Sequence, residues 1–263
     1  MGIGRKSLLW LVLLVIAVPI ALLVAESVAY GWRWPEVIPH QFSLRGWRVV
    51  FGDPKIVTAL QTTVIIGACV VVLNLAIAFP AGKALAWFSF KGKSVIESFL
   101  LLPILVPALA VAMGLQITMI RFGLADHITG VILVHLLPTL PYSLRIMRAG
   151  YERLGMKWIE QARTLGAQPW TIFSTVSLPL LLPSLRSLVL LTFVISLSQY
   201  VLTAVIGGGL VTTLPIIYYP FLSSSDPAVI ATFSLVFVLM PIAFMAAVEG
   251  MTRVIIWYKK MFT

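Results

Sequence analysis

Long stretches without a charged residue alternate with short charged segments along the chain. Most are long enough for a helix that crosses about 30 Å of hydrocarbon, which takes about 20 apolar residues. The fifth stretch is the longest, but Gly207-Gly208-Gly209 and Pro215 end a helix within it, so we expect one span over about Ser187–Ile206 and an uncharged connection after it. The pattern predicts six transmembrane helices, within Leu8–Ala25, Ile56–Gly82, Ser98–Ile120, His127–Leu144, Ser187–Ser225 and Pro227–Val248.

One further stretch, Thr164–Leu185, is also uncharged but is less typical of a span. It holds three prolines, a glycine and seven Ser, Thr or Gln residues. Lys and Arg concentrate in cytoplasmic loops, so the charge distribution distinguishes a seventh span from a loop. With six spans and a cytoplasmic N-terminus, 14 of the 19 basic residues lie inside, whereas with seven spans only 10 do. We therefore expect a cytoplasmic loop, with both termini in the cytoplasm.

The composition agrees with an all-α, polytopic membrane protein. Hydrophobic residues make up 60% of the chain and charged residues 11%, against about 25% charged in soluble domains. The net charge of +10 follows from the basic inside loops and does not indicate a nucleic acid partner. The first stretch could be a signal peptide that begins with Arg5 and Lys6. Its length exceeds the usual apolar region of one, so we expect a retained helix.

The loop itself has the pattern of two short helices. Between Tyr151 and Leu165 apolar residues recur at helical spacing, which predicts an amphipathic helix. Gly166 suits the left-handed position that ends a helix, and Pro169 suits the first turn of the next one. We expect Leu178-Pro179 to stop that second helix. The apolar faces are Leu154, Trp158, Ala162 and Leu165 in the first helix, and Trp170, Phe173 and Val176 in the second.

The same loop resembles a known motif. Glu160-Gln161-Ala162, then Gly166, then nine residues and Val176-Ser177-Leu178-Pro179, is similar to the pattern E-A-A-x3-G-x9-I-x-L-P. That pattern, the EAA loop, marks permease subunits of binding-protein-dependent ABC importers. The departures are Gln161 for the second Ala and Val176 for Ile. Charged and proline-bearing stretches in the chain also look like those of spermidine, sulfate, molybdate and ferric-iron permeases. Without the motif, the segment would be read as an ordinary interfacial helix.

The resemblance implies a fold, partners and roles. The fold would be that of a type I ABC importer permease in a bacterial cytoplasmic (inner) membrane. The partners would be two ATPase subunits, an identical or sister permease, an extracytoplasmic solute-binding protein and membrane lipid. The loop would dock into the ATPase by helix-in-groove recognition. The coupling residues would be Trp158, Glu160, Gln161, Ala162, Gly166, Ala167, Pro169, Trp170, Phe173, Leu178 and Pro179.

No catalytic or metal site stands out, so we expect no enzyme activity in this chain. The nearest match to a phosphate-binding loop is Gly92-Lys93-Ser94, where Trp87 takes the place of the first glycine. We therefore expect no cofactor here, and ATP and magnesium bound by the partner ATPase. The three histidines share no ligand spacing. His135 lies inside the fourth span, where a buried interhelical hydrogen bond is favoured over metal binding.

A translocation pathway needs polar groups within the spans, although the same groups often only hold helices together. Prolines 103, 107, 138 and 141 predict helix bends. The alternative function is a stand-alone ion- or proton-coupled transporter, which usually has charged residues in mid-membrane; the spans here have almost none. The substrate stays open between polyamine, thiamine, ferric iron, an oxyanion and another small solute. The pathway candidates are Asn74, Gln116, Ser196, Ser198, Gln199 and Tyr200.

These expectations divide the chain into three parts. Residues 1–55 hold the first helix and an outer connection. Residues 56–250 form a core of five transmembrane helices, which includes the loop 150–180. Residues 251–263 form a cytoplasmic C-terminal tail.

Overall fold

The computed structural model describes residues 3–32, 35–223 and 226–261, and this part of the chain is almost entirely helical. It contains no strand, only a single β-bridge between Ala29 and Phe42. Residues 1, 2, 33, 34, 224, 225, 262 and 263, with Arg33 and the end of the expected tail, lie outside it. The helices are α1 Ile3–Val28, α2 Arg45–Gly52, α3 Pro54–Trp87, α4 Lys93–Leu105, α5 Ala108–Arg121, α6 Ile128–Leu154, α7 Lys157–Thr164, α8 Pro169–Ile172, the π-helix Phe173–Ser177, α9 Leu178–Leu197, α10 Tyr200–Ile206, α11 Leu214–Phe221 and α12 Pro227–Met261.

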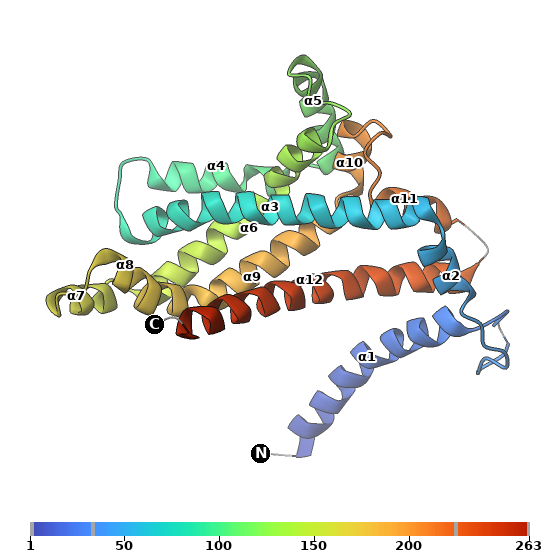
Figure 1. Ribbon diagram of the computed structural model, residues 1–263. Helices are drawn as coiled ribbons and strands as arrows, with labels where there is room; N and C mark the ends of the chain where they lie inside the picture. The colour runs from blue at the N-terminus through green and yellow to red at the C-terminus, as the bar shows by residue number, and fades with distance from the viewer. Residues whose placement is uncertain (1–2, 33–34, 224–225, 262–263) are drawn as a thin grey trace.

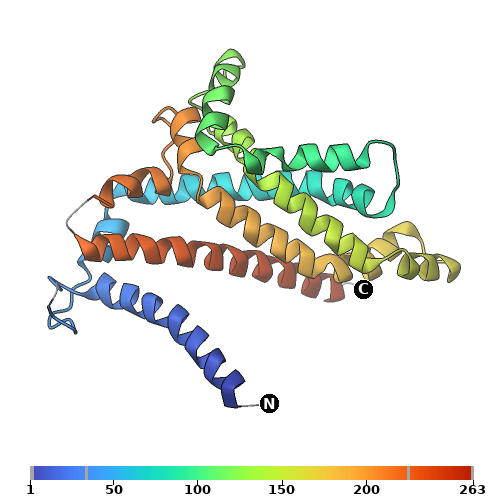
Figure 2. The same cartoon turned by 180° about the vertical axis from the view of Figure 1, so that it is seen from behind.

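Five helical segments are long and apolar enough to cross a membrane, and the bent pair α4–α5 makes a sixth if it counts as one span. Each of the six predicted spans therefore has a helical counterpart. The long helices lie roughly side by side, and α7 and α8, the α3–α4 turn and the C-terminal end of α12 lie at one end of the bundle (Figures 1 and 2). The opposite end carries α2 and α11 (Figure 1).

Helices α3, α6 and α9 form the centre of the bundle. A Cβ atom at Gly82 on α3 would lie 2.6 Å from the Cβ of Met147 on α6. A Cβ at Gly150 on α6 would lie 2.6 Å from the Ser184 hydroxyl oxygen on α9. Glycine at these two positions lets the backbones approach closely, as membrane helices do where lipid offers no hydrophobic drive for their association.

The first helix is the least integrated part of the bundle. Helix α1 packs mainly against α12, with a smaller contact to α2. Most of its described side chains are exposed, including Trp10 at 68% and Val15 at 67%. In both views its beginning diverges from the other helices (Figures 1 and 2).

The third predicted span, Ser98–Ile120, is not one continuous helix. It breaks at Val106 and Pro107, and α4 and α5 meet at an angle of 103°. Val106 is extended, as a residue before proline prefers. The predicted bend at Pro107 is confirmed, whereas Pro103, Pro138 and Pro141 lie inside α4 and α6.

The fifth span also differs from its prediction. Leu178-Pro179 does not stop the preceding helix, which runs from Pro169 to Leu197. The π-helix provides the reason, because the Leu178 N–H donates to the carbonyl of Phe173, five residues earlier. This wider turn accommodates Pro179, which lacks an N–H. The span then breaks at Ser198 and Gln199, and α10 ends before Gly207, as predicted.

The two bent halves, α5 and α10, pack against each other on one side of the bundle (Figures 1 and 2). Their contact belongs to an apolar cluster whose buried members are Ile66, Val70, Ala112, Val131, Val134, Leu202, Ile206 and Val211. This packing explains how two short helices can turn away from the long ones and still bury an apolar side.

Candidate functional site

The loop between α6 and α9 is built from two glycines with left-handed backbone. Gly155, with φ +67°, ends α6, and Gly166, with φ +79°, ends α7. The Gly166 N–H donates to the Arg163 carbonyl over 2.9 Å, and the Ala167 N–H donates to the Ala162 carbonyl over 3.0 Å. This pair of bonds is a Schellman motif. The predicted left-handed glycine at the end of α7 is therefore confirmed.

Two of the four residues on the predicted apolar face of the first loop helix, Leu154 and Ala162, pack against the core as predicted, and the other two do not. Trp158 is 58% exposed and Leu165 is 87% exposed, whereas Ile159 is buried and Ala162 is half-buried against the core. Gly155 ends α6, and α7 packs through Ile159 and Ala162 instead of continuing the apolar face of α6. The sequence pattern treated Tyr151–Leu165 as one helix, whereas the structure divides it between α6 and α7.

The outer side of the loop is polar but carries large apolar side chains. Trp170 is 70% exposed and packs beside Phe173, with ring centroids 5.5 Å apart. Phe173 in turn meets Phe79 of α3 edge to face, which holds α8 against the bundle. Exposed apolar groups gathered on one face indicate a contact surface for another molecule. The exposed members are Met156, Trp158, Leu165 and Trp170.

The remaining motif residues lie on the same segment. Glu160, Gln161 and Pro169 are exposed, and Glu160 has no ion pair among the residues that the structure describes. Leu178 and Pro179 are exposed at the start of α9. The structure thus brings the predicted coupling residues together at one end of the bundle, on the loop and on the turn of helix that follows it.

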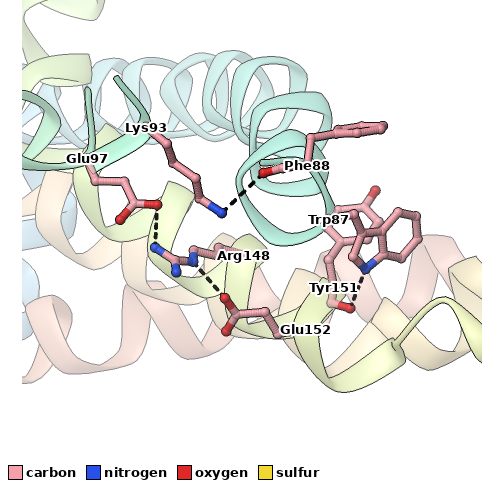
Figure 3. A network of polar contacts seen from close by, with 7 residues as sticks. All are labelled: Trp87, Phe88, Lys93, Glu97, Arg148, Tyr151 and Glu152. Atoms are coloured by element: carbon pink, nitrogen blue, oxygen red, sulfur yellow. Dashed lines mark hydrogen bonds and ion pairs between the residues drawn. The ribbon is translucent and has the colours of Figure 1, made fainter. Parts of the chain in front are cut away.

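An ion-pair network that the sequence analysis missed lies beside this loop (Figure 3). Arg148 of α6 contacts Glu97 of α4 and Glu152 of α6, both over 2.7 Å. The Trp87 indole at the end of α3 donates to the Tyr151 carbonyl over 3.0 Å. The network joins the α3–α4 hairpin to the last turns of α6, directly before the loop. The four-residue spacing of Arg148 and Glu152 was visible in the sequence, but nothing there pointed to Glu97.

The predicted pathway residues do not form one site. Asn74 and Ser196 are buried between helices, and Gln116 and Ser198 are exposed. The Asn74 amide donates to the Thr139 hydroxyl over 2.8 Å and to the Val70 carbonyl over 2.9 Å. Asn74 therefore holds α3 to α6. Gln199 and Tyr200 are half-buried at the break in the fifth span.

His135 of α6 makes the interhelical contacts that the sequence predicted. Its Nδ1 lies 3.0 Å from the Ser196 hydroxyl of α9, and its Nε2 lies 3.0 Å from the Thr203 hydroxyl of α10. The side chain is 1% exposed. Elsewhere in the described residues, no group of three His, Cys, Asp or Glu side chains could hold a metal ion.

Comparison with protein families gives one match, to binding-protein-dependent transport system inner membrane components, over residues 74–255. The chain is 27% identical over 168 residues to a molybdate/tungstate transport system permease protein of Thermococcus kodakarensis, covering 64% of each protein. It is 23% identical over 252 residues to a spermidine/putrescine transport system permease protein of Haemophilus influenzae, covering 95% of this chain and 96% of that one.

Solved structures share the fold. A bacterial ABC transporter involved in the import of the acidic polysaccharide alginate matches with a TM-score of 0.69 and 20% identity, covering 95% of each chain. The MetNI methionine ABC transporter in an inward-facing conformation matches with a TM-score of 0.59 and 18% identity, covering 75% of this chain and 94% of that one. The fold is therefore that of ABC importer permeases.

Proposed function

This chain belongs to the family of binding-protein-dependent transport system inner membrane components, and from that premise we propose that it is a permease subunit of an ABC importer. It would form half of a translocation pathway and pass conformational change between that pathway and a separate ATPase. The observation that carries the proposal is the loop between α6 and α9. Two short helices there expose Trp158, Glu160, Leu165 and Trp170 at one end of a membrane bundle.

The loop has the properties of a docking element for an ATPase groove. Glu160 would anchor α7 through charge-assisted hydrogen bonds with the partner, and Gly166 would fix the turn that presents Trp170. The other contact or packing residues would be Trp158, Gln161, Ala162, Ala167, Pro169, Phe173, Leu178 and Pro179. Such helix-in-groove contacts could drive two arrangements of a permease pair.

The same geometry supports an orientation in a bacterial cytoplasmic membrane. The loop, the α3–α4 turn and the C-terminal end of α12 lie at one end of the bundle (Figure 1), and most of the basic residues lie in segments that the six-span pattern assigns to this side. We infer that this end faces the cytoplasm. There it would meet two ATPase subunits, which bind ATP and magnesium and perform the hydrolysis. The remaining partners would be an identical or sister permease and an extracytoplasmic solute-binding protein.

The names of the relatives do not select a substrate for this chain. They include permeases for molybdate and tungstate and for spermidine and putrescine, which are solutes of opposite charge. The chain also spans 64% and 63% of the molybdate/tungstate permeases of Thermococcus kodakarensis and Pyrococcus abyssi. In this family selectivity would reside mainly in the binding protein.

The test is isolation of the tagged chain from its own membranes. We expect an ATPase subunit to co-purify and the reconstituted assembly to hydrolyse Mg-ATP. Glu160→Ala and Gly166→Ala should weaken co-purification or separate hydrolysis from uptake, while the chain still inserts. Glu36→Ala is the matched control, because it removes an exposed carboxylate from the connection between α1 and α2. Solute uptake driven by an ion gradient without any ATPase would contradict the proposal.

A further inference from the structure

Neither proline nor glycine marks the break in the fifth span. The segment from Ile195 to Ile206, ISLSQYVLTAVI, contains neither proline nor glycine, which are the usual causes of a sharp helix bend. Gln199 nevertheless has φ −79° and ψ +79°. The Tyr200 N–H donates to the Ser198 carbonyl two residues earlier, over 3.0 Å. Gln199 is thus the centre of an inverse γ-turn, set between two helices.

At the break, side-chain donors replace the backbone hydrogen bonds that a continuous helix would make. The Ser198 hydroxyl and the Gln199 amide both donate to the Ile195 carbonyl, over 2.8 and 3.0 Å. The Thr203 hydroxyl donates to the Gln199 carbonyl over 2.6 Å. In hydrocarbon an unsatisfied backbone group is costly, so these bonds allow the break to exist inside the bundle. Inserted side chains of this kind are a recognised cause of a bend.

His135 joins the two sides of the break from a third element. It contacts Ser196 before the turn and Thr203 after it. The Thr203 hydroxyl has a single hydrogen, which it gives to the Gln199 carbonyl, so the imidazole Nε2–H must be the donor to Thr203. In the neutral ring Nδ1 is then an acceptor, and the Ser196 hydroxyl donates to it. The hydrogen bonds run in one direction, from Ser196 through His135 and Thr203 to the Gln199 carbonyl.

The turn places polar groups on the outer side of the helix pair. Ser198 is exposed, as is Val194 one turn earlier on the same side. The Tyr200 ring stacks on Tyr219 of α11, with centroids 4.6 Å apart. The whole stretch from Ser187 to Ser223 carries no charged residue. The surface at the break therefore offers hydroxyl, amide and phenol groups, without a fixed charge.

We propose that His135 is a positioning residue that holds the fifth span broken at Ser198–Gln199, so that this uncharged polar surface lies on the translocation pathway. The pathway role rests on the proposed function, whereas the positioning role does not. The surface would bind passing solutes through hydrogen bonds from neutral groups. The fifth span would offer no charged side chain to pair with a charged solute. A buried histidine that only filled space would not need both ring nitrogens aimed at opposite sides of the turn.

The test uses cysteine reactivity in the full-length chain in membrane vesicles. Cys69 is the only cysteine, so Cys69→Ala gives a clean background. Ser198→Cys reports on the exposed turn, and Val205→Cys reports on α10, where Val205 packs in the cluster shared with α5. We expect N-ethylmaleimide to react faster with the cysteine at position 198 than with the one at 205.

The partner variants then separate positioning from simple packing. Thr203→Val and His135→Leu should let α10 leave α5 and raise the reactivity at position 205 by about tenfold, which is the scale of a lost buried hydrogen bond in a local opening equilibrium. Thr203→Ser keeps the hydroxyl and should restore the low reactivity. The control Thr192→Val removes a buried bond of the same helix pair, between Ser143 and Thr192 at 2.9 Å, and should leave position 205 slow.

Equal reactivity at position 205 in Thr203→Val, His135→Leu and Thr192→Val would overturn the proposal. If His135→Leu does not accumulate in membranes, Ser196→Ala replaces it, because that change removes one donor and leaves the imidazole in place. The labelling needs neither ATPase nor solute. A negative result would therefore leave the importer assignment standing, and absence of a co-purifying ATPase would leave the positioning role standing.

Discussion

Glycine at single positions sets how closely the central helices of this protein approach one another. At Gly82 an added Cβ would meet the Met147 side chain at 2.6 Å and the Arg148 backbone nitrogen at 3.0 Å. Backbone cannot move aside as a flexible side chain does, so this contact cannot be relieved locally. At Gly114 on α5, in contrast, nothing lies within 4 Å of an added Cβ. The structure therefore has room for alanine at Gly114 but not at Gly82.

Gly82→Ala should therefore lower stability and Gly114→Ala should not. Overpacking of a filled interface costs about 1–3 kcal/mol, whereas alanine in an open helical position gains up to about 1 kcal/mol over glycine. The thermal midpoint of the detergent-solubilised chain, followed by tryptophan fluorescence, measures both changes. A fall in the midpoint of Gly114→Ala as large as that of Gly82→Ala would show that contact at the helix interface is not the cause.

At the scale of elements, the α3–α4 hairpin is tied to the end of α6 by Arg148. Its guanidinium contacts two carboxylates at once, which an ammonium cannot reproduce with the same geometry. The side chain is 35% exposed, so solvent screens the pairs and limits their contribution. Because these ion pairs lie directly before the loop, they help to fix the position of α7.

Arg148→Gln should destabilise the chain by about 1 kcal/mol, since partly exposed pairs lie at the upper end of surface values. Arg148→Lys should recover only part of that loss. Arg253→Gln is the matched control, because Arg253 is 80% exposed and lies 3.9 Å from Glu249. Urea or thermal unfolding of the three variants measures the difference. Equal stability of Arg148→Gln and Arg253→Gln would contradict a structural role for the hairpin contact.

The sequence predicted where the helices lie better than it predicted where they are interrupted. Charge-free length located the six spans, and glycine chemistry located the turn at Gly166. Proline was misleading at Pro179, because the π-helix that accommodates it depends on packing of the whole segment. The break at Gln199 was not predicted, because no proline or glycine marks it and the contact between His135 and Ser196 joins residues more than sixty positions apart. The exposed side of α7 was missed because Gly155 ends α6, so the apolar face of α6 does not continue into α7.

At the scale of the whole molecule, the C-terminal end of α12 and the loop between α6 and α9 share one end of the bundle, and α2 and α11 lie at the other (Figure 1). Two exposed positions can show on which side of the membrane the loop and the α1–α2 connection lie. Leu165 is 87% exposed in the loop, and Val37 is 81% exposed in the connection between α1 and α2. Both are accessible to a reagent in water on their own side of a membrane.

In a Cys69→Ala background, a membrane-impermeant maleimide added to intact spheroplasts should label Val37→Cys and leave Leu165→Cys unlabelled. Inverted vesicles should give the opposite result, because their cytoplasmic face is outside. The measurement is the labelled fraction on a gel for each cysteine and each preparation. Labelling of both positions from the same side would contradict the six-span topology.

The packing of α1 against α12 has a consequence for biogenesis. Helix α1 is made before its main partner, α12, and the 198 residues from Ala29 to Asp226 lie between them. At about 5–20 residues per second of synthesis, α1 waits roughly 10–40 s in the bilayer before synthesis of α12 begins. During that interval lipid covers its apolar surface, apart from the small contact with α2. The first helix must therefore be stable in the membrane as a lone span, which fits its continuous run of exposed leucine, isoleucine and valine side chains.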